Sequence, residues 1–403
     1  MQLIELHILQ SFPVSCLNRD DVGAPKTATF GGVPRARLSS QSLKRAIRLM
    51  LQQSSPALFA AERSKLIITP ISSRLERAGF EPSKALALAR AVGTHLATLD
   101  EKAAAKGVEK VKTLMFLSPG ELDSIAAHLA EASKAAPLLG GKSGAPTSKK
   151  KAQADTGFDV SKVVARACKD VGLKDAADVA LFGRMVASDH SLTVEGAAMF
   201  GHALSTHKAE NDLDFYTAVD DRQKEDPTVG EEDRTGSGMM GVLEFTSAVY
   251  YRYAAVNLGL LFDEEHLAKL AKDERRKVVD AFIHATLLAV PGARKNSMNA
   301  HTEVGYALGL YHSKGQPIQL INAYEEPLWA RGGSGLLKPS VRKGLLHLKK
   351  IEEFMGDGAT EKVATGTYQP NADTGETVEF TKQHIPDQLN LNDFVKRLTA
   401  HVQ

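Results

Sequence analysis

Strand-like segments at both ends of the chain enclose a long helical block, and this order constrains the fold more than any other feature. Ile4, Leu6 and Ile8 alternate with polar residues, which is typical of a half-buried strand. Residues 242–253 are β-branched and aromatic, which predicts a second strand. Between them, residues 57–136 are rich in alanine and follow a helical period. The order predicts an α+β fold whose sheet is interrupted by a helical insertion.

Local patterns predict further elements. These are an amphipathic helix over 41–53 capped by Ser39 or Ser40 after a loop that begins at Pro13, short strands over 178–187 and 198–206, a helix from Asp263 to about Ala289, and a helix near 392–402. The segment 137–157 is rich in Gly, Ser, Lys and Pro, a composition typical of a flexible loop.

The charges of the chain are balanced overall but segregated locally. Fifty Lys and Arg residues against 48 Asp and Glu residues give a net charge of +2, so total charge gives no argument for a polyanionic partner. Residues 19–48 nevertheless carry a net charge of +5, and residues 210–233 carry −8. This pattern suits a protein with one polyanion-binding surface, or one that stacks head to tail on copies of itself.

The opening residues Met1–Glu5 lack the basic start of a signal peptide, and no apolar run reaches the ~20 residues of a membrane span. Cys16 and Cys168 are far apart and match no disulfide framework or zinc-site spacing. We therefore expect a cytoplasmic protein with no membrane association and no cofactor.

Several motifs resemble catalytic or cofactor sites but lack the context that such sites need. Gly236–Gly241 spells a dinucleotide fingerprint, yet an acidic loop precedes it and a strand follows, and Gly140–Ser143 resembles a phosphate loop with no strand leading in. His202 and His207 lack metal-site spacing. Asp220-Asp221 lies in an acidic stretch typical of a solvated loop. The sequence therefore favours a protein that is not an enzyme.

Residues 35–48 combine an extended basic segment with a basic helix. Arg35 and Arg37 are two residues apart, so on a strand they point the same way. The helix that follows should offer free backbone N–H groups and a positive dipole end, which together attract anions. On this helix Gln41, Lys44 and Arg48 share the face opposite the apolar residues. The two interpretations are an ordinary solvated surface helix and a helix that binds the phosphodiester backbone of a nucleic acid.

Neighbouring residues favour nucleic acid. Arg19 and Lys26 lie in the preceding loop, and the Phe30-Gly31-Gly32 turn permits close approach of a ligand to the backbone. Tyr250, Tyr251 and Tyr253, with Phe245 and Arg252, suit either a base-stacking platform or the core of the sheet. Phe215-Tyr216-Thr217 lies in the otherwise polar 206–241 segment, which is typical of an exposed hairpin tip that wedges into a base stack or a neighbouring subunit.

Several blocks of the sequence resemble the backbone subunit of the type I-E CRISPR surveillance complex Cascade, the CasC family. They are SCLNRDD (15–21), FGG (30–32), RLSSQSLKRA (37–46), ALFGRM (180–185), HALSTH (202–207), DLDFYTAVDD (212–221), EFTS (244–247), YRY (251–253) and VPGA (290–293).

This resemblance implies a hand-shaped fold with a modified RNA-recognition-like antiparallel sheet as its palm. The palm would comprise residues 1–56, 178–205 and 242–403, the last with C-terminal helices. A helical finger insertion would span 57–177, with a flexible loop at 137–157, and a β-hairpin thumb would span 206–241.

The resemblance also implies a function and partners. Copies of the family subunit, six in the family, polymerise head to tail along a CRISPR guide RNA and present its bases for pairing with target DNA in antiviral defence. The other partners are the large subunit, the small subunit, the 5′-end-capping subunit and the guide-processing endoribonuclease. The family subunit is not itself a nuclease.

Specific residues follow from position in the matching blocks. The implied guide-backbone contacts are Arg19, Lys26, Ser39, Gln41, Lys44 and Arg48, and the basic segment itself adds Arg35, Arg37 and Arg45. Met185 is implied to press against the base beside a displaced nucleotide, and the alternative is a core position on the 178–187 strand. Phe215, Tyr216 and Thr217 are placed on the thumb. The alternative function is an RNA-processing endoribonuclease of a related fold, with His7, His202 and His207 as candidates.

Overall fold

The computed structural model describes residues 1–135, 157–218, 222, 228, 239–330, 335–356, 358–370 and 386–403. In this part of the chain the fold is α+β and is dominated by one ten-stranded sheet with the order β12-β11-β10-β1-β9-β7-β3-β2. β6 and β8 also pair with β9. All pairs in this sheet are antiparallel except β11–β12. The predicted α+β class is confirmed.

The strands have the following bounds: β1 Leu3–Ser15, β2 Thr27–Phe30, β3 Val33–Leu38, β4 Glu62–Ser64, β5 Met115–Leu117, β6 Ala198–Phe200, β7 Ala203–Ser205, β8 Asp212–Ala218, β9 Met239–Asn257, β10 Tyr306–His312, β11 Glu361–Thr365 and β12 Asp387–Gln388. β4 and β5 form a separate two-stranded sheet.

The helices have the following bounds: α1 Ser40–Ser54, α2 Ile68–Arg77, α3 Pro82–Leu96, α4 Glu101–Ala104, α5 Pro119–Ala135, α7 Val160–Val171, α8 Ala177–Phe182, α10 Leu258–Leu261, α11 Lys272–Leu288, α12 Leu337–Met355 and α13 Leu391–Thr399, with short 3₁₀ turns η1 His190–Leu192 and η2 Leu320–Tyr324. No helix in the described ranges is long and apolar enough to cross a lipid bilayer.

The central strand β1 is buried on both faces, which corrects the prediction of a half-buried strand. Ile4 and its apolar alternates pack in the core formed with α1, α11 and α13. The polar alternates are also buried, because Tyr253 donates a hydrogen bond to Glu5 (2.6 Å) and Tyr251 pairs with Nδ1 of His7 (2.9 Å). Burial lowers the pKa of His7 to about 4, so the imidazole is neutral inside the protein.

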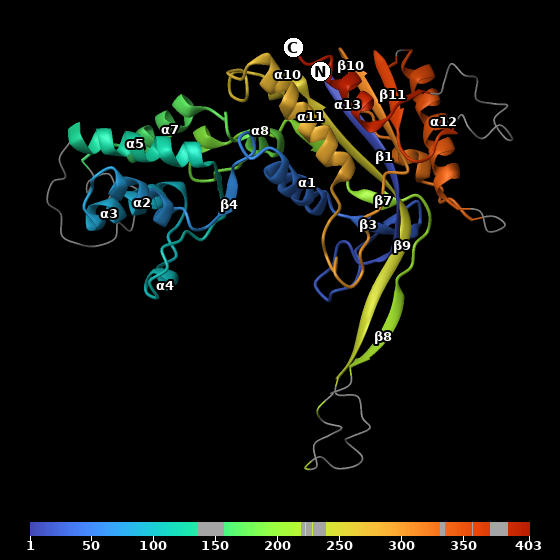
Figure 1. Ribbon diagram of the computed structural model, residues 1–403, viewed down its shortest axis with the longest axis horizontal. Coiled ribbons are helices and arrows are strands. Elements are labelled where there is room, and N and C mark those ends of the chain that lie inside the picture. Colours follow the sequence, from blue (N-terminus) through green and yellow to red (C-terminus); the bar gives the residue numbers. More distant parts are fainter. Residues whose placement is uncertain are drawn as a thin grey trace.

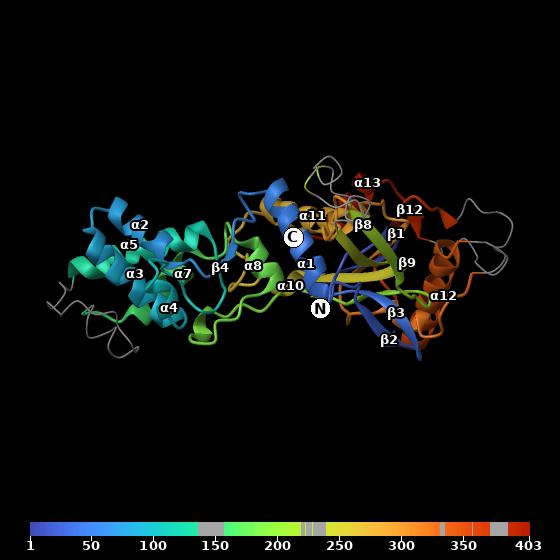
Figure 2. The same ribbon diagram turned by 90° about the horizontal axis from the view of Figure 1, so that it is seen from below.

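The helices between β4 and α8 form an arm beside the sheet, on the left in Figure 1. α2, α3, α5 and α7 surround an apolar core of their own, which is distinct from the core under the main sheet. The strands β8 and β9 continue beyond the sheet as a projecting two-stranded ladder, seen at the bottom of Figure 1 and nearly end-on in Figure 2.

Three local predictions were wrong. The 178–187 segment is not a strand: it forms α8 and then a loop, because its apolar run packs as a helix in the main core. β1 continues past Pro13 to Ser15 through an irregularity in its pairing with β9. Asp263 caps only a short turn through its bond to the Glu265 amide, and α11 begins at Lys272.

The other elements follow the sequence closely. α1 begins after Ser39, whose hydroxyl accepts a hydrogen bond from the Ser42 amide at 3.2 Å. The strands predicted in 198–206 and 242–253, and the C-terminal helix, are present as β6, β7, β9 and α13. Gly140–Ser143, Asp220-Asp221, nearly all of 137–157 and the first part of Gly236–Gly241 lie outside the described residues.

Candidate nucleic-acid interface

The loop before β2 is built around Asn18 and Asp20. The Asn18 side chain accepts a hydrogen bond from the Ser39 amide (2.8 Å), which ties the loop to the start of α1. Asp20 accepts from the amides of Val22 and Ala24 and shapes the turn. The loop then returns along β3, where the amide of Arg37 donates to the carbonyl of Lys26 (2.8 Å). These bonds bring Arg19 and Lys26 beside the basic strand β3.

One face of α1 is anchored and the other is basic. Leu43, Ile47 and Leu51 are buried. Lys44 and Arg48 are half-buried on the other side of the helix, and Arg45 is exposed. The period of apolar residues therefore leaves a row of cations outside the core, as the sequence predicted.

Aromatic rings hold two of these cations in place. The Lys44 amine lies 5.3 Å from the centre of the Phe200 ring. The guanidinium groups of Arg48 and Arg63 lie 5.2 and 4.7 Å from the centre of one ring, that of Phe116. Burial, with the nearby charge of Arg63, lowers the pKa of both Lys44 and Arg48. The side chains are thus fixed close together despite their mutual repulsion.

We call the following set the basic surface: Arg19, Lys26, Arg37, Lys44, Arg45, Arg48 and Arg63. None of these side chains forms an ion pair with another described residue. Nε of Arg37 and Nη1 of Arg48 are buried with no hydrogen-bond acceptor in the described part of the chain. A buried donor without an acceptor is costly, and it is also out of reach of an external ligand. The groups suited to bind an anion are therefore the exposed side chains of Arg45 and Arg63 and the accessible parts of the half-buried cations.

Arg35 does not belong to this surface, and its prediction as an RNA contact was wrong. Its side chain is 0% exposed. The guanidinium donates to the carbonyls of Phe30, Ser205, Tyr324 and Glu325 at 2.8–3.1 Å. Arg35 therefore joins three distant segments of the chain.

The two glycines of the β2–β3 turn serve the same junction. Gly31 and Gly32 have φ angles of +62° and +75°, which suit a tight hairpin turn. A Cβ added to Gly31 would lie 1.7 Å from the Glu325 carbonyl oxygen. The close approach that the sequence suggested is therefore to the protein's own backbone and not to a ligand.

The start of α1 is also less open than predicted. The Ser40 amide donates to Nδ1 of His202 (3.0 Å), and the Ser42 and Leu43 amides donate to Ser39. Ser39 is largely buried in its capping role, whereas Gln41 is exposed. The positive character of this region therefore comes mainly from side chains and not from free amides.

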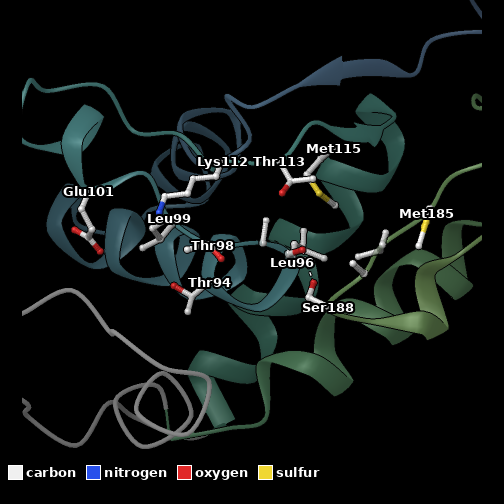
Figure 3. A pocket seen from close by; sticks show the side chains of 13 residues that line it. Thr94, Leu96, Thr98, Leu99, Glu101, Lys112, Thr113, Met115, Met185 and Ser188 are labelled. Carbon is white, nitrogen blue, oxygen red and sulfur yellow. Dashed lines mark hydrogen bonds between the residues drawn. The ribbon is translucent and has the colours of Figure 1, made fainter. Parts of the chain in front are cut away.

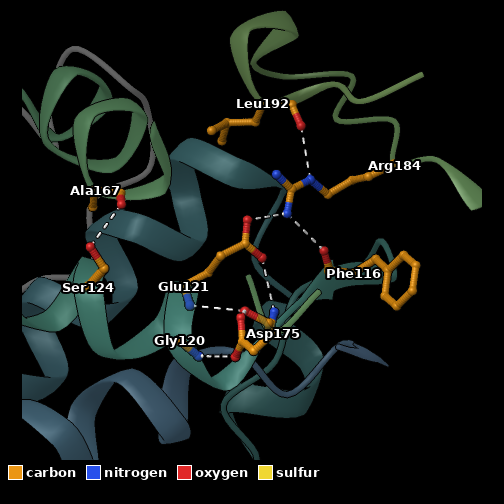
Figure 4. Close-up of polar contacts among 9 residues, drawn as sticks. Phe116, Gly120, Glu121, Ser124, Ala167, Asp175, Arg184 and Leu192 are labelled. Atoms are coloured by element: carbon orange, nitrogen blue, oxygen red, sulfur yellow. Dashed lines mark hydrogen bonds and ion pairs between the residues drawn. The ribbon is translucent and has the colours of Figure 1, made fainter. Parts of the chain in front are cut away.

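Met185 is 77% exposed, which excludes a place in the core. Its loop is fixed by the preceding residue, Arg184, which forms a buried ion pair with Glu121 at 2.7 Å and donates to the carbonyls of Phe116 and Leu192 (Figure 4). An ion pair between the arm and the loop thus holds an apolar side chain in solvent.

A cavity of about 540 Å³ adjoins Met185 in the arm. Leu96, Met115 and Val186 supply apolar lining, and Lys112 is among the polar lining residues. In Figure 3 Met185 stands at one end of this cavity and Glu101 at the other. Met115, which lines the cavity, immediately precedes Phe116, and the guanidinium groups of Arg48 and Arg63 lie over the Phe116 ring. The cavity therefore lies close to the basic surface.

The projecting ladder carries one apolar face in solvent. Phe215 pairs with Val242, and Thr217 with Met240, so these four side chains share a face with Leu213. Phe215 and Met240 are each 76% exposed. On the opposite face the Tyr216 ring lies over Gly241, where an added Cβ would be only 2.5 Å from it. We call Leu213, Phe215, Met240 and Val242 the apolar hairpin face.

Residues 4–396 match the model of the CT1975-like protein family of Cas proteins. The chain belongs to this family. Its structure is similar to that of a chain of a solved "CRISPR RNA-guided surveillance complex, pre-nicking", with a TM-score of 0.77 and 25% identity over 100% of both chains. A chain of a second "CRISPR RNA-guided surveillance complex" shares the fold, with a TM-score of 0.68 and 22% identity over 99% of both chains. No curated protein matches the chain.

In this CT1975-like chain the aromatic residues of β9 belong to the core, which was one of the two interpretations that the sequence left open. Tyr250, Tyr251, Tyr253 and Arg252 are all buried, and Arg252 donates to the carbonyl of Thr286 (2.6 Å). These side chains hold β9 against β1 and α11, so the stacking interpretation was wrong.

The three candidate histidines occupy separate structural positions. His7 lies inside the sheet and His202 accepts from α1. Nδ1 of His207 bonds the Lys208 carbonyl, and its Nε2 accepts from the Val249 amide. Within the described ranges, no three His, Cys, Asp or Glu side chains converge as metal ligands.

Arg63 is the main member of the basic surface that sequence reasoning missed. It lies with Lys65 in the alanine-rich block 57–136, which the sequence predicted to be helical, whereas the structure places it on the short strand β4. Only the pairing of Arg63 with Phe116 in the β4–β5 sheet brings it opposite Arg48.

Proposed function

We propose that this chain is the guide-RNA-binding backbone subunit of a Cascade-type CRISPR surveillance complex, of the type I-E CasC kind. In this role copies of the chain polymerise along one CRISPR RNA and present its bases to target DNA for antiviral defence. The family membership and the likeness to chains of surveillance complexes support a role of this class.

The observation that carries the RNA-binding part is the basic surface. Its cations lack ion-pair partners among the described residues, and Arg45 and Arg63 are exposed. Such side chains bind phosphates and read no sequence, which suits a subunit that must accept any guide. Pairing between guide and target then supplies the specificity.

The arrangement of sheet, arm and projecting ladder supports palm, finger and thumb roles for these three parts. Met185 and the apolar hairpin face are exposed apolar groups at the arm and on the ladder. In the proposed filament, Met185 lies against a guide base and the hairpin of one copy contacts its neighbour. Six copies, together with the large, small, 5′-end-capping and guide-processing subunits, would complete the complex, and this subunit would not be catalytic.

The test is assembly on RNA of increasing length. Native mass spectrometry of the purified chain with single-stranded RNAs should show bound copies that increase stepwise with RNA length. A variant with Phe215→Ser and Val242→Ser should bind one copy but not assemble neighbours. Its matched control is Phe354→Ser, which changes a residue that is 88% exposed at the end of α12. Binding of a single copy to RNA of every length would refute polymerisation, and specific cleavage of the RNA would favour the endoribonuclease.

A further inference from the structure

A buried carboxylate lies directly behind the basic surface. Asp178, in the first turn of α8, is 0% exposed. α8 packs against α1, and the two helices lie side by side in Figures 1 and 2. Neither carboxylate oxygen of Asp178 has a hydrogen-bond partner in the described part of the chain, and Nη1 of Arg48 is likewise buried without an acceptor. The positive charge of Arg48 opposes the effect of burial on the pKa of Asp178.

The charges around this site form a short series from interior to surface. Asp178 is innermost, Arg48 is half-buried over one ring, and Arg63 is exposed over the same ring. Arg45 also acts on Arg48 from the same helix. Arg45, Arg48 and Arg63 thus lie on the surface side of a single buried anion. In the proposed function, a phosphate of RNA approaches the same three cations from outside.

We propose that Asp178 is a positioning residue for Arg48, and that Asp178 takes up a proton from solvent when an RNA phosphate binds beside Arg48 and Arg63. In the free protein its carboxylate is the buried counter-charge behind the Arg48 guanidinium, which lies over Phe116 and forms no direct ion pair with the carboxylate. A bound phosphate replaces this counter-charge, and its negative charge favours the neutral form of the buried acid. This inference rests on the proposed RNA binding.

Proton uptake by Asp178 on RNA binding should be measurable near neutral pH. Burial raises the pKa of Asp178 to about 7, against the opposing influence of Arg48. In free protein near this pH the carboxyl group is therefore partly protonated, and a bound phosphate shifts it towards full protonation. Well below pH 7 the Asp178 carboxyl group is already protonated in both the free and the RNA-bound protein, so RNA binding no longer takes up a proton. RNA affinity should consequently rise as pH falls towards 6, by at most about tenfold per pH unit.

Calorimetry can count this proton. Titration of the full chain with a single-stranded RNA oligonucleotide, in buffers of different ionisation enthalpy near pH 7, should show uptake of a fraction of a proton per bound subunit. Asp178→Asn, which cannot titrate, should lose that fraction and the matching part of the pH dependence of affinity.

Two further measurements test whether the proton is taken up by Asp178 and not by another carboxylate. Glu62→Gln removes an exposed carboxylate next to Arg63 and should keep wild-type proton uptake. An infrared difference spectrum on RNA binding should gain a protonated-carboxyl band that is absent from Asp178→Asn. RNA binding with equal proton uptake in wild type and Asp178→Asn would overturn the inference alone, whereas absence of RNA binding by the wild type would overturn the proposed function.

The fold of the asparagine variant can be checked separately. Between the usual value of 3.8 and about 7, the folded chain retains a proton on Asp178 that the unfolded chain has released. The contribution of this group to the free energy of unfolding therefore falls as pH rises through that window. Asp178→Asn should accordingly melt no lower than wild type near pH 8 without RNA. A lower melting temperature would contradict the assignment of Asp178 as a strained buried carboxylate.

Discussion

Replacing Lys44 and Arg48 with glutamine gives the most direct test of the basic surface. Both side chains are half-buried over aromatic rings, so glutamine keeps much of the aliphatic stem while it removes the charge. If each cation contacts one phosphate of single-stranded RNA, each substitution should reduce the slope of log K against log salt by about 0.7.

The magnitude follows from that slope. Between 50 and 200 mM salt, the affinity ratio of wild type to a single variant should fall by about 2.6-fold, and that of the double variant by about 7-fold. Fluorescence anisotropy with two RNAs of unrelated sequence measures these slopes. The losses should be the same for both RNAs, because a phosphate contact carries no sequence information.

A matched control is available on the far side of the sheet. Lys350, exposed on α12, carries the same charge as Lys44 but lies away from α1. Lys350→Gln should leave the slope at its wild-type value. An Arg48→Gln protein whose slope equals that of wild type, or whose defect differs between the two RNAs, would refute the assignment of Arg48 to a phosphate.

Three further predictions concern the loop, the hairpin and the arm. Met185→Ala should leave the melting temperature of the RNA-free chain unchanged, because the side chain is in solvent. Target-DNA binding by the assembled complex should fall with Met185→Ala and remain near the wild-type level with Met185→Leu. A large loss of stability with Met185→Ala would contradict the exposed position. Replacing residues 212–241 with a short Gly-Ser turn leaves the buried Thr206 and Ala209 in place, so it should shift the melting temperature by only a few degrees while it abolishes filament assembly. Filaments of full length on a long guide would exclude the thumb role. Arg184→Met should lower the free energy of unfolding by about 3–5 kcal/mol, because it leaves Glu121 buried without its partner, and Glu121→Gln in the same chain should recover part of the loss in a urea denaturation series.

Sequence reasoning worked best where structure depends on nearby residues. α1 was placed within one or two residues, because its apolar period and its Ser39 cap both lie within the segment itself. The same reasoning failed for 178–187, where a short apolar run fits a strand and a helix equally well. Packing against α1 in the main core decides for α8.

At the candidate site, too, local sequence predicted some features and distant contacts decided others. The two-residue spacing on a predicted strand grouped Arg35 with Arg37, and their charge predicted that both are exposed. Four carbonyls, from residues 30, 205, 324 and 325, instead hold Arg35 in the interior. Met185 was assigned to an exposed site only through the family resemblance, and its exposure depends on an ion pair between residues 63 positions apart.

The sequence by itself determined the α+β order, the basic helix and the acidic, apolar-poor segment that contains β8. These features depend on periodicity and composition, which act over a few residues. The tertiary structure alone decided which cations stay free for a ligand, because an arginine becomes structural or functional according to acceptors far away in the chain. Arg35 donates hydrogen bonds to such distant carbonyls, that of Tyr324 among them. Arg48 instead lies over the Phe116 ring, near Arg63 and the buried Asp178.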